Sequence, residues 1–316
     1  MSQQHAASEM HIRLQRLKSL FIDHDDARKV SRRVADIVGD FLAAQQLELT
    51  AEVRGLAVLG NSGTGKTASV LEALAQIGMQ RTRVGDNPRP FLAVQLSADA
   101  TLRRVCSDIL LEYGWAPKAR DNTQRIWADI GTYVARLQTI VLVLDEIQHV
   151  RSAGSHDRAA LRDFLKSLVQ PRQTQVIPIV VGMPEFEEVF NSDIQLRRRF
   201  DLVHIRTLDP ATDLKLAIQS LDSLVNAAGL SLTTSVTSPE FASRLLHASE
   251  YAFGEMCAVN LRGIKRAIQG ESSNVEIGHF AEAHRSRYDC VPARNPFVAA
   301  NFQDIKIGDP NADEPW

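Results

Sequence analysis

The chain has 316 residues, of which 44% are hydrophobic and 23% are charged, and its formal net charge at pH 7 is −2. These values are typical of a soluble globular protein with one large core and a smaller appendage, and they exclude a surface that is basic throughout. The sequence has no apolar run of the roughly 18 residues that a membrane span requires. The polar N-terminus also lacks the apolar centre of a signal peptide, so we expect a cytoplasmic protein without a membrane partner.

Charge is distributed unevenly along this nearly neutral chain. Residues 11–33 carry a net charge of +4, whereas residues 296–316 carry a net charge of −3. Cysteine is sparse, and Cys106, Cys257 and Cys290 lie far apart, a pattern that indicates neither a disulfide framework nor a metal site. We therefore expect three reduced thiols.

The apolar pattern predicts an N-terminal basic helical segment, residues 1–50, followed by alternating strands and helices. Within it, Val30, Val34 and Phe41 recur at helical spacing and predict an amphipathic helix over residues 26–47. Short apolar runs then predict strands at 56–60, 90–96, 140–144 and 176–181, and an alternating pattern predicts a fifth at 201–208. Helices are predicted between these strands, at 65–78, 101–113, 123–138 and 156–170.

Strands that alternate with helices indicate an α/β fold with a doubly wound parallel five-stranded sheet, which we place at residues 51–209. Pro178 is unusual inside one of these strands, because proline cannot donate a hydrogen bond to a sheet ladder. Residues 210–288 lose the strand pattern and predict a small C-terminal helical domain. Residues 289–316 show no helical period, and we expect an extended or disordered tail there.

Residues 60–67 read G-x-x-x-x-G-K-T, directly after a predicted strand and before a predicted helix. Glycines let the backbone curl so that successive N–H groups point at phosphate oxygens, and the helix presents its positive N-terminal end. Lys66 would reach the β and γ phosphates, and the Thr67 hydroxyl would bind Mg²⁺. The residues expected to hold ATP are Gly60, Asn61, Ser62, Gly63, Thr64, Gly65, Lys66, Thr67 and Ala68.

Two acidic residues, Asp145 and Glu146, end the third predicted strand. Because the carboxyl ends of parallel strands share one edge of a sheet, both should lie beside the phosphate loop. Asp145 is expected to hold Mg²⁺ through water, and Glu146 to orient and deprotonate the water that attacks the γ phosphate. A loop carboxylate without a catalytic role is the alternative for each of them.

Together these motifs resemble the AAA+ ATPases, and among them the TniB and TnsC transposition regulators, with MuB a more distant relative. The resemblance covers nearly the whole chain. After the phosphate loop it rests on Asp145-Glu146-Ile147-Gln148, on residues 180–185 and 195–200, and on Asn295-Pro296-Phe297. It implies an AAA+ sheet domain, a helical lid domain at residues 210–288, and ATP bound between subunits.

The same resemblance assigns roles to several further residues. Arg199, or alternatively Arg198, matches the arginine finger, a guanidinium that stabilises charge on the γ phosphate of a neighbouring subunit. Arg262 and Arg266 share one helical face, and either one matches the second sensor arginine. Met183 stands where the first sensor is normally polar, so we expect slow hydrolysis. A surface arginine is the alternative at each basic position.

Basic residues after the second strand match regions that face the central channel in this class of ATPase. They are Arg103, Arg104, Lys118 and Arg120. In a channel they would bind the phosphates of double-stranded DNA without reading its sequence, although ordinary surface charge is an equal alternative.

The function implied by the resemblance is ATP-dependent regulation of DNA transposition. The chain would oligomerise on target DNA as a ring or helical filament and recruit or activate a transposase, with hydrolysis driving disassembly. The tail would bind a transposase or targeting adaptor through Phe297, Phe302 and Trp316, or fold back along its own or a neighbouring subunit. A replication-initiator or helicase-loader ATPase and a DNA motor are the alternatives.

Overall fold

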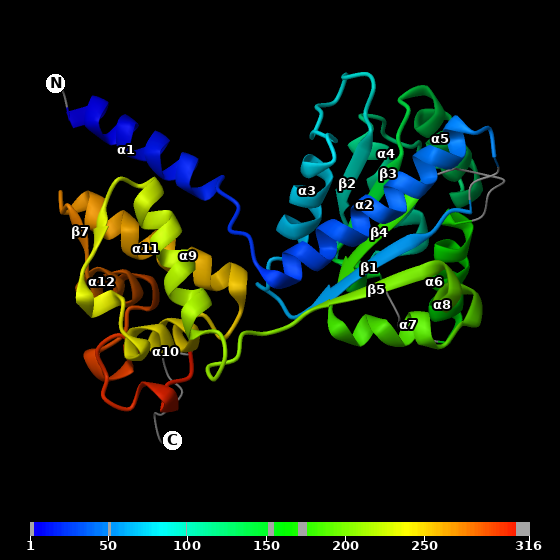
Figure 1. Cartoon of the computed structure of the whole chain (residues 1–316). Coiled ribbons are helices and arrows are strands. Elements are labelled where there is room, and N and C mark those ends of the chain that lie inside the picture. Colours follow the sequence, from blue (N-terminus) through cyan, green and yellow to red (C-terminus); the bar gives the residue numbers. More distant parts are fainter. Residues whose placement is uncertain (1–2, 50–51, 99, 151–154, 170–175, 308–316) are drawn as a thin grey trace. The chain divides into compact units, whose positions relative to one another are not determined.

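The computed structural model describes residues 3–49, 52–98, 100–150, 155–169 and 176–307. Its contacts divide the chain into two units (Figure 1). The sheet unit comprises Asp25–Asn61 and Lys66–Arg206, and the lid unit comprises Met1–His24, Ser62–Gly65 and Thr207–Trp316. The tip of the phosphate loop therefore groups with the lid unit, while its two flanks belong to the sheet unit.

The sheet unit contains five parallel strands, β1 (Gly55–Gly60), β2 (Phe91–Gln95), β3 (Val141–Asp145), β4 (Ile177–Gly182) and β5 (Phe200–Ile205). Their order is β2-β3-β4-β1-β5 (Figure 1). β1 and β4 are buried along their whole length, as expected for continuous apolar strands in a parallel sheet covered on both faces. The predicted α/β class and the five-stranded parallel sheet are confirmed.

Pro178 fits into β4 because of where the pairing with β1 begins. The N–H of Ile177 donates to the carbonyl of Ile140 at 2.8 Å, which lies on the β3 side of the strand. Alternate residues of a strand face opposite neighbours, so position 178 faces β1, with which β4 pairs only from Ile179 onward. The missing N–H of the proline therefore falls before that ladder starts.

The predicted helices of the sheet unit are all present, and two further helices, at residues 187–191 and 194–199, were not predicted. The helices of this unit are α2 (Asp25–Gln46), α3 (Lys66–Gln76), α4 (Leu102–Glu112), α5 (Thr123–Arg136), α6 (Ser155–Leu168), α7 (Glu187–Asn191) and α8 (Ile194–Arg199), with 3₁₀ turns η1 (Ile147–His149) and η2 (Pro184–Phe186). α2 buries Val30, Val34 and Phe41 in the core of the sheet unit, as its amphipathic pattern predicted.

The lid unit is helical apart from one short sheet. Its helices are α1 (Gln3–Lys18), α9 (Leu214–Ala227), α10 (Pro239–Ala248), α11 (Phe253–Gln269) and α12 (Ile277–Tyr288), with the turn η3 (Thr234–Val236). β6 (Ser231–Leu232) and β7 (Asn274–Val275) pair in parallel, which the prediction of an entirely helical region missed because two-residue strands are too short to show alternation. None of the described helices is both long enough and apolar enough to span a membrane.

The first 50 residues, expected to form one basic helical segment, divide between the two units. α1 belongs to the lid unit, where Leu14 and Leu17 join the hydrophobic core and Arg13 donates to the carbonyl of Ala228. α2 belongs to the sheet unit, because its apolar face packs against the sheet there. The boundary at residue 50 is therefore replaced by one between α1 and α2.

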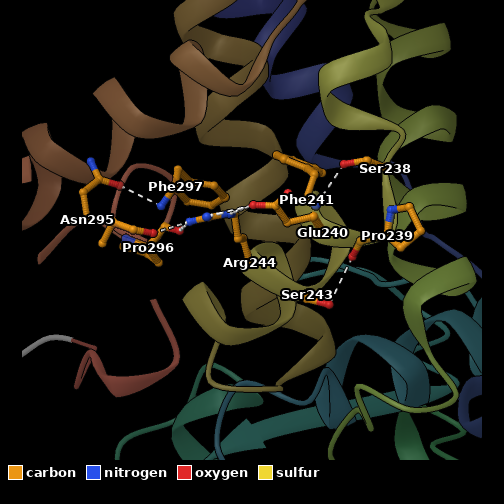
Figure 2. A network of polar contacts seen from close by, with 10 residues as sticks. Ser238, Pro239, Glu240, Phe241, Ser243, Arg244, Asn295, Pro296 and Phe297 are labelled. Carbon is orange, nitrogen blue, oxygen red and sulfur yellow. Dashed lines mark hydrogen bonds and ion pairs between the residues drawn. The ribbon is translucent and has the colours of Figure 1, made fainter. Parts of the chain in front are cut away.

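The C-terminal segment, expected to be extended or disordered, is folded into the lid unit as far as Ile307. It forms the turns η4 (Pro292–Arg294) and η5 (Phe302–Asp304), and Phe297 is only 5% exposed. Arg244 reaches this segment from α10, and its Nη1 donates to the carbonyl of Pro296 at 2.7 Å (Figure 2). The same Nη1 donates to the carbonyl of Ala299, also at 2.7 Å. The tail prediction is wrong for these residues, while Trp316 lies outside the described ones.

Candidate nucleotide site

The phosphate loop connects β1 to α3 in a conformation that glycine makes possible. Gly63 has a φ of +73° and Gly65 a φ of +90°, in the left-handed region that other residues rarely adopt. α3 begins at Lys66, so the first N–H groups of this helix lack intrahelical partners and are available to an anion. The loop thus fits the phosphate oxygens of ATP.

The side chain of Lys66 folds back over the loop. Its Nζ donates to the carbonyls of Gly60 and Asn61, at 2.8 Å in both cases. Burial lowers the pKa of Lys66, and the negative charges of Glu146 and then Asp145 oppose that shift. The ammonium group therefore lies against the loop carbonyls, at the loop where phosphate is expected to bind.

Thr67 and Asp145 are in direct contact. The Thr67 hydroxyl donates to Oδ2 of Asp145 at 2.8 Å, and this bond counteracts the burial that raises the pKa of Asp145. Hard oxygens in this arrangement fit Mg²⁺, which binds through one or two protein groups together with phosphate and water. Among the described residues no group of three or more His, Cys, Asp or Glu side chains could hold a metal ion.

Glu146 follows Asp145 in a left-handed backbone conformation, with φ 59° and ψ 41°. This conformation is uncommon for residues other than glycine. Its carboxylate accepts a hydrogen bond from Nε2 of Gln148. The Oε1 of Gln148 accepts from the N–H of Met183 at 3.2 Å. No role for Gln148 was predicted from the sequence. Only its position, two residues after Glu146, could have indicated that it contacts this carboxylate.

Three consecutive arginines end α8. Arg199, the predicted arginine finger, donates from Nη1 to the carbonyl of Val169 at 2.9 Å and is thus bound within its own subunit. The side chain of Arg198 is exposed, and its guanidinium makes no hydrogen bond or ion pair with the part of the chain that the structure describes. α8 is held by Asp193, which caps the helix and pairs with Lys166 at 3.0 Å. Of the two candidates for the arginine finger, Arg198 is therefore the one whose guanidinium is not bound by the described residues.

The two candidate sensor arginines make different contacts in the lid unit. Arg262 pairs with Glu255 on the same helix, whereas Arg266 pairs with Glu282 of α12 at 3.5 Å. The backbone N–H of Glu255 donates to the carbonyl of Gly63, at the tip of the phosphate loop, at 3.1 Å. Arg262 is therefore linked to the carbonyl of Gly63 through Glu255, whereas the ion pair of Arg266 is with α12.

The four residues predicted to contact DNA divide into two pairs. The guanidinium of Arg103 donates to backbone carbonyls of the loop 118–121 and so fixes the course of that loop. Arg104 pairs with Asp108 at 2.8 Å. All four residues are exposed, but the side chains of Lys118 and Arg120 make no hydrogen bond or ion pair with the described residues. Arg103 and Arg104 are thus engaged within the chain, whereas Lys118 and Arg120 are not.

This chain resembles known proteins in both sequence and fold. The profile of the bacterial TniB protein matches residues 16–209 of this chain. No match was found among curated proteins. The fold resembles CDC6p from Pyrobaculum aerophilum, with a TM-score of 0.58 and 12% identity over 87% of this chain and 71% of that chain.

Two Aeropyrum pernix structures are also similar. The ORC2 protein in ADPNP–ADP complexes gives a TM-score of 0.54 and 14% identity over 86% of this chain and 71% of that one. The ORC1 protein in complex with DNA gives a TM-score of 0.55 and 17% identity over 85% of this chain and 66% of that one. Identities this low establish a shared fold alone. The family match spans more than half of the chain and includes the phosphate loop and the two acidic residues. The chain therefore belongs to the TniB family and is an ATPase with the AAA+ fold.

Proposed function

We propose that this TniB-family ATPase regulates DNA transposition by assembling on target DNA with ATP bound and recruiting or activating a transposase. Hydrolysis then drives disassembly. The observation that carries the proposal is the contact of Thr67 with Asp145 beside Glu146, in a chain whose residues 16–209 match the TniB profile. A hydrolysis site in a transposition-associated family supports an ATP-timed assembly.

The residues of the site divide the work of hydrolysis. The loop N–H groups and Lys66 bind and orient the phosphates, and Thr67 with Asp145 would hold Mg²⁺. When bound, this ion would neutralise charge on the β and γ phosphates. Glu146 accepts the proton of the attacking water. Arg198 of a neighbouring subunit would complete the site, which makes hydrolysis depend on a homo-oligomer, either a ring or a helical filament.

Hydrolysis of ATP by this protein would be slow. Met183 lies at the end of β4, where a polar side chain would help to place the attacking water. A thioether is only a weak acceptor and cannot donate a proton. ATP would therefore act as an assembly switch, and rapid turnover with DNA present that Met183→Ala left unchanged would contradict this.

Contact with double-stranded DNA is proposed for the exposed pair Lys118 and Arg120. The similar Aeropyrum pernix ORC1 protein was solved in complex with DNA, which is compatible with a DNA partner here. Phosphate contacts release counterions, so binding should weaken as salt rises, without preference for sequence. Replacing both residues with alanine should lower affinity for duplexes of unrelated sequence equally and reduce the salt dependence.

The test of the proposed function is negative-stain imaging of the protein with duplex DNA, with and without a non-hydrolysable ATP analogue. Rings or filaments that need both DNA and the analogue would support the proposal. Lys66→Ala, which removes the phosphate-binding ammonium, should prevent them. A monomer under every condition would contradict it, and rapid turnover with translocation along DNA would indicate a motor instead.

A further inference from the structure

We infer that Gln148 is a positioning residue for ATP hydrolysis, whose side-chain amide holds the carboxylate of Glu146 and joins it to the tip of β4. The inference rests on the proposed role of Glu146 as the base. It assigns to Gln148, together with the backbone of Met183, the task that a polar side chain at position 183 would otherwise perform.

Both ends of the Gln148 amide are used. Nε2 donates to Oε2 of Glu146, and Oε1 accepts from the N–H of Met183 at 3.2 Å. A carboxylate accepts only and a backbone N–H donates only, so the two partners fix which end of the amide faces which group. The amide therefore connects the end of β4 with the acidic residue that follows β3.

The local backbone brings the amide to this place. The left-handed conformation of Glu146 turns the chain into η1, and the N–H of His149 donates to the Glu146 carbonyl at 2.9 Å. The turn lies close against Gly182, where an added Cβ would come within 2.6 Å of Ile147 Cγ2 and 3.3 Å of Gln148 Oε1. A glycine at position 182 thus permits the approach that the Gln148 bridge requires.

Gln148 would affect hydrolysis by orienting the carboxylate of Glu146. A carboxamide is not basic near neutral pH, so Gln148 cannot replace Glu146 as the base. It can restrict the rotamers of Glu146, and a base works only within hydrogen-bond reach of the water that it deprotonates. The negative charge of Glu146 opposes the lowering of the Lys66 pKa by burial, and does so more strongly than that of Asp145.

The experiment compares Gln148→Met, which keeps the size of the side chain and removes both hydrogen bonds, with the natural chain. Steady-state hydrolysis and the Kd of a non-hydrolysable ATP analogue are measured for each. We expect kcat to fall about 10- to 100-fold, within the contribution of a general base, with the Kd unchanged. The matched control is Gln76→Met on α3, which removes an exposed bond to Glu72 Oε1 of 3.3 Å and should leave both values unchanged.

A second pair of variants separates positioning from packing. In a Glu146→Gln background no base is left to position, so Gln148→Met should lower the residual hydrolysis by less than about twofold. Equal fold losses in both backgrounds, or an unchanged or higher kcat for Gln148→Met alone, would overturn the inference. If Glu146→Gln by itself left hydrolysis intact, the proposed base would fail too, and this outcome differs from a failure of Gln148 alone.

Discussion

The hydroxyl of Thr67, at the start of α3, donates a 2.8 Å hydrogen bond to Oδ2 of Asp145, at the end of β3. These residues are far apart in the chain, and their contact brings the phosphate loop and the acidic pair into one site. It also counteracts the burial that raises the pKa of Asp145. The ionised carboxylate that Mg²⁺ needs is therefore stabilised from the loop itself.

Thr67→Val should lower Mg²⁺-dependent hydrolysis about 100-fold, because it removes a metal-binding oxygen and the hydrogen bond to Asp145. Without that bond the pKa of Asp145 rises further, so the acidic limb of the pH–rate profile should move to higher pH. Thr67→Ser keeps the hydroxyl and is the control. Equal activity of the two variants would show that the hydroxyl has no part in the reaction.

Arg198→Ala should lower the rate of hydrolysis, whereas Arg199→Ala should lower stability. Removing Arg198 should lower hydrolysis of the assembled protein by about 10³-fold while the Kd for ATP is unchanged, as for an arginine finger supplied in trans. Removing Arg199 leaves the Val169 carbonyl without this donor and should lower the free energy of unfolding by about 1 kcal/mol. Hydrolysis and denaturation are measured for both variants. If Arg199→Ala were the variant that lost hydrolysis at unchanged stability, the original assignment to Arg199 would be restored.

Gly254→Ala should weaken ATP binding about tenfold, a loss of about 1.4 kcal/mol. A Cβ at position 254 would lie 2.6 Å from the carbonyl oxygen of Gly63, so the tip of the phosphate loop must shift. Gly278→Ala is a matched control, because nothing described lies within 4 Å of a Cβ there. Isothermal titration with an ATP analogue gives both affinities, and equal values would show that the loop tolerates the shift.

Phe297→Ala should destabilise the lid unit by about 3 kcal/mol, since the ring is buried against Phe241 and Phe280. Arg244→Met should also destabilise it, because the carbonyls of Pro296 and Ala299 lose their donor (Figure 2). Chemical denaturation measures both effects. Unchanged stability of Phe297→Ala with loss of a transposase contact would instead support the earlier idea of a partner-binding tail.

Stability should fall as the pH drops from about 6.5 to about 4, because of His284. Burial, with the charges of Arg262 and Arg287, lowers the pKa of His284 from 6.5 to about 4. In that window the unfolded chain binds a proton that the folded chain does not, so acid favours unfolding by up to about 3 kcal/mol. His284→Phe should flatten this part of the stability curve. An unchanged pH dependence in denaturant titrations would argue against a neutral buried imidazole.

Most of the sheet unit and part of the site could be predicted from the sequence. The residues 60–67 and the acidic pair after β3 are defined by short spacings, and the chemistry of phosphate and Mg²⁺ dictates the residue types. Buried parallel strands produce continuous apolar runs, which is why four of the five were found, whereas the fifth was found from its alternating pattern. The TniB and AAA+ assignments followed from the order of these motifs and were confirmed.

The partners of individual polar side chains required the tertiary structure. Arg198 and Arg199 are chemically identical neighbours, and only the position of the Val169 carbonyl distinguishes them. The C-terminal segment lacks a helical period because it folds through irregular turns, and its order comes from Arg244 and the aromatic core of the lid unit. Local sequence thus determined the phosphate loop, the acidic pair and the sheet, because those depend on spacing within a few residues. Packing between distant segments decided that Arg199 is bound to the Val169 carbonyl and that the Gln148 amide holds Glu146.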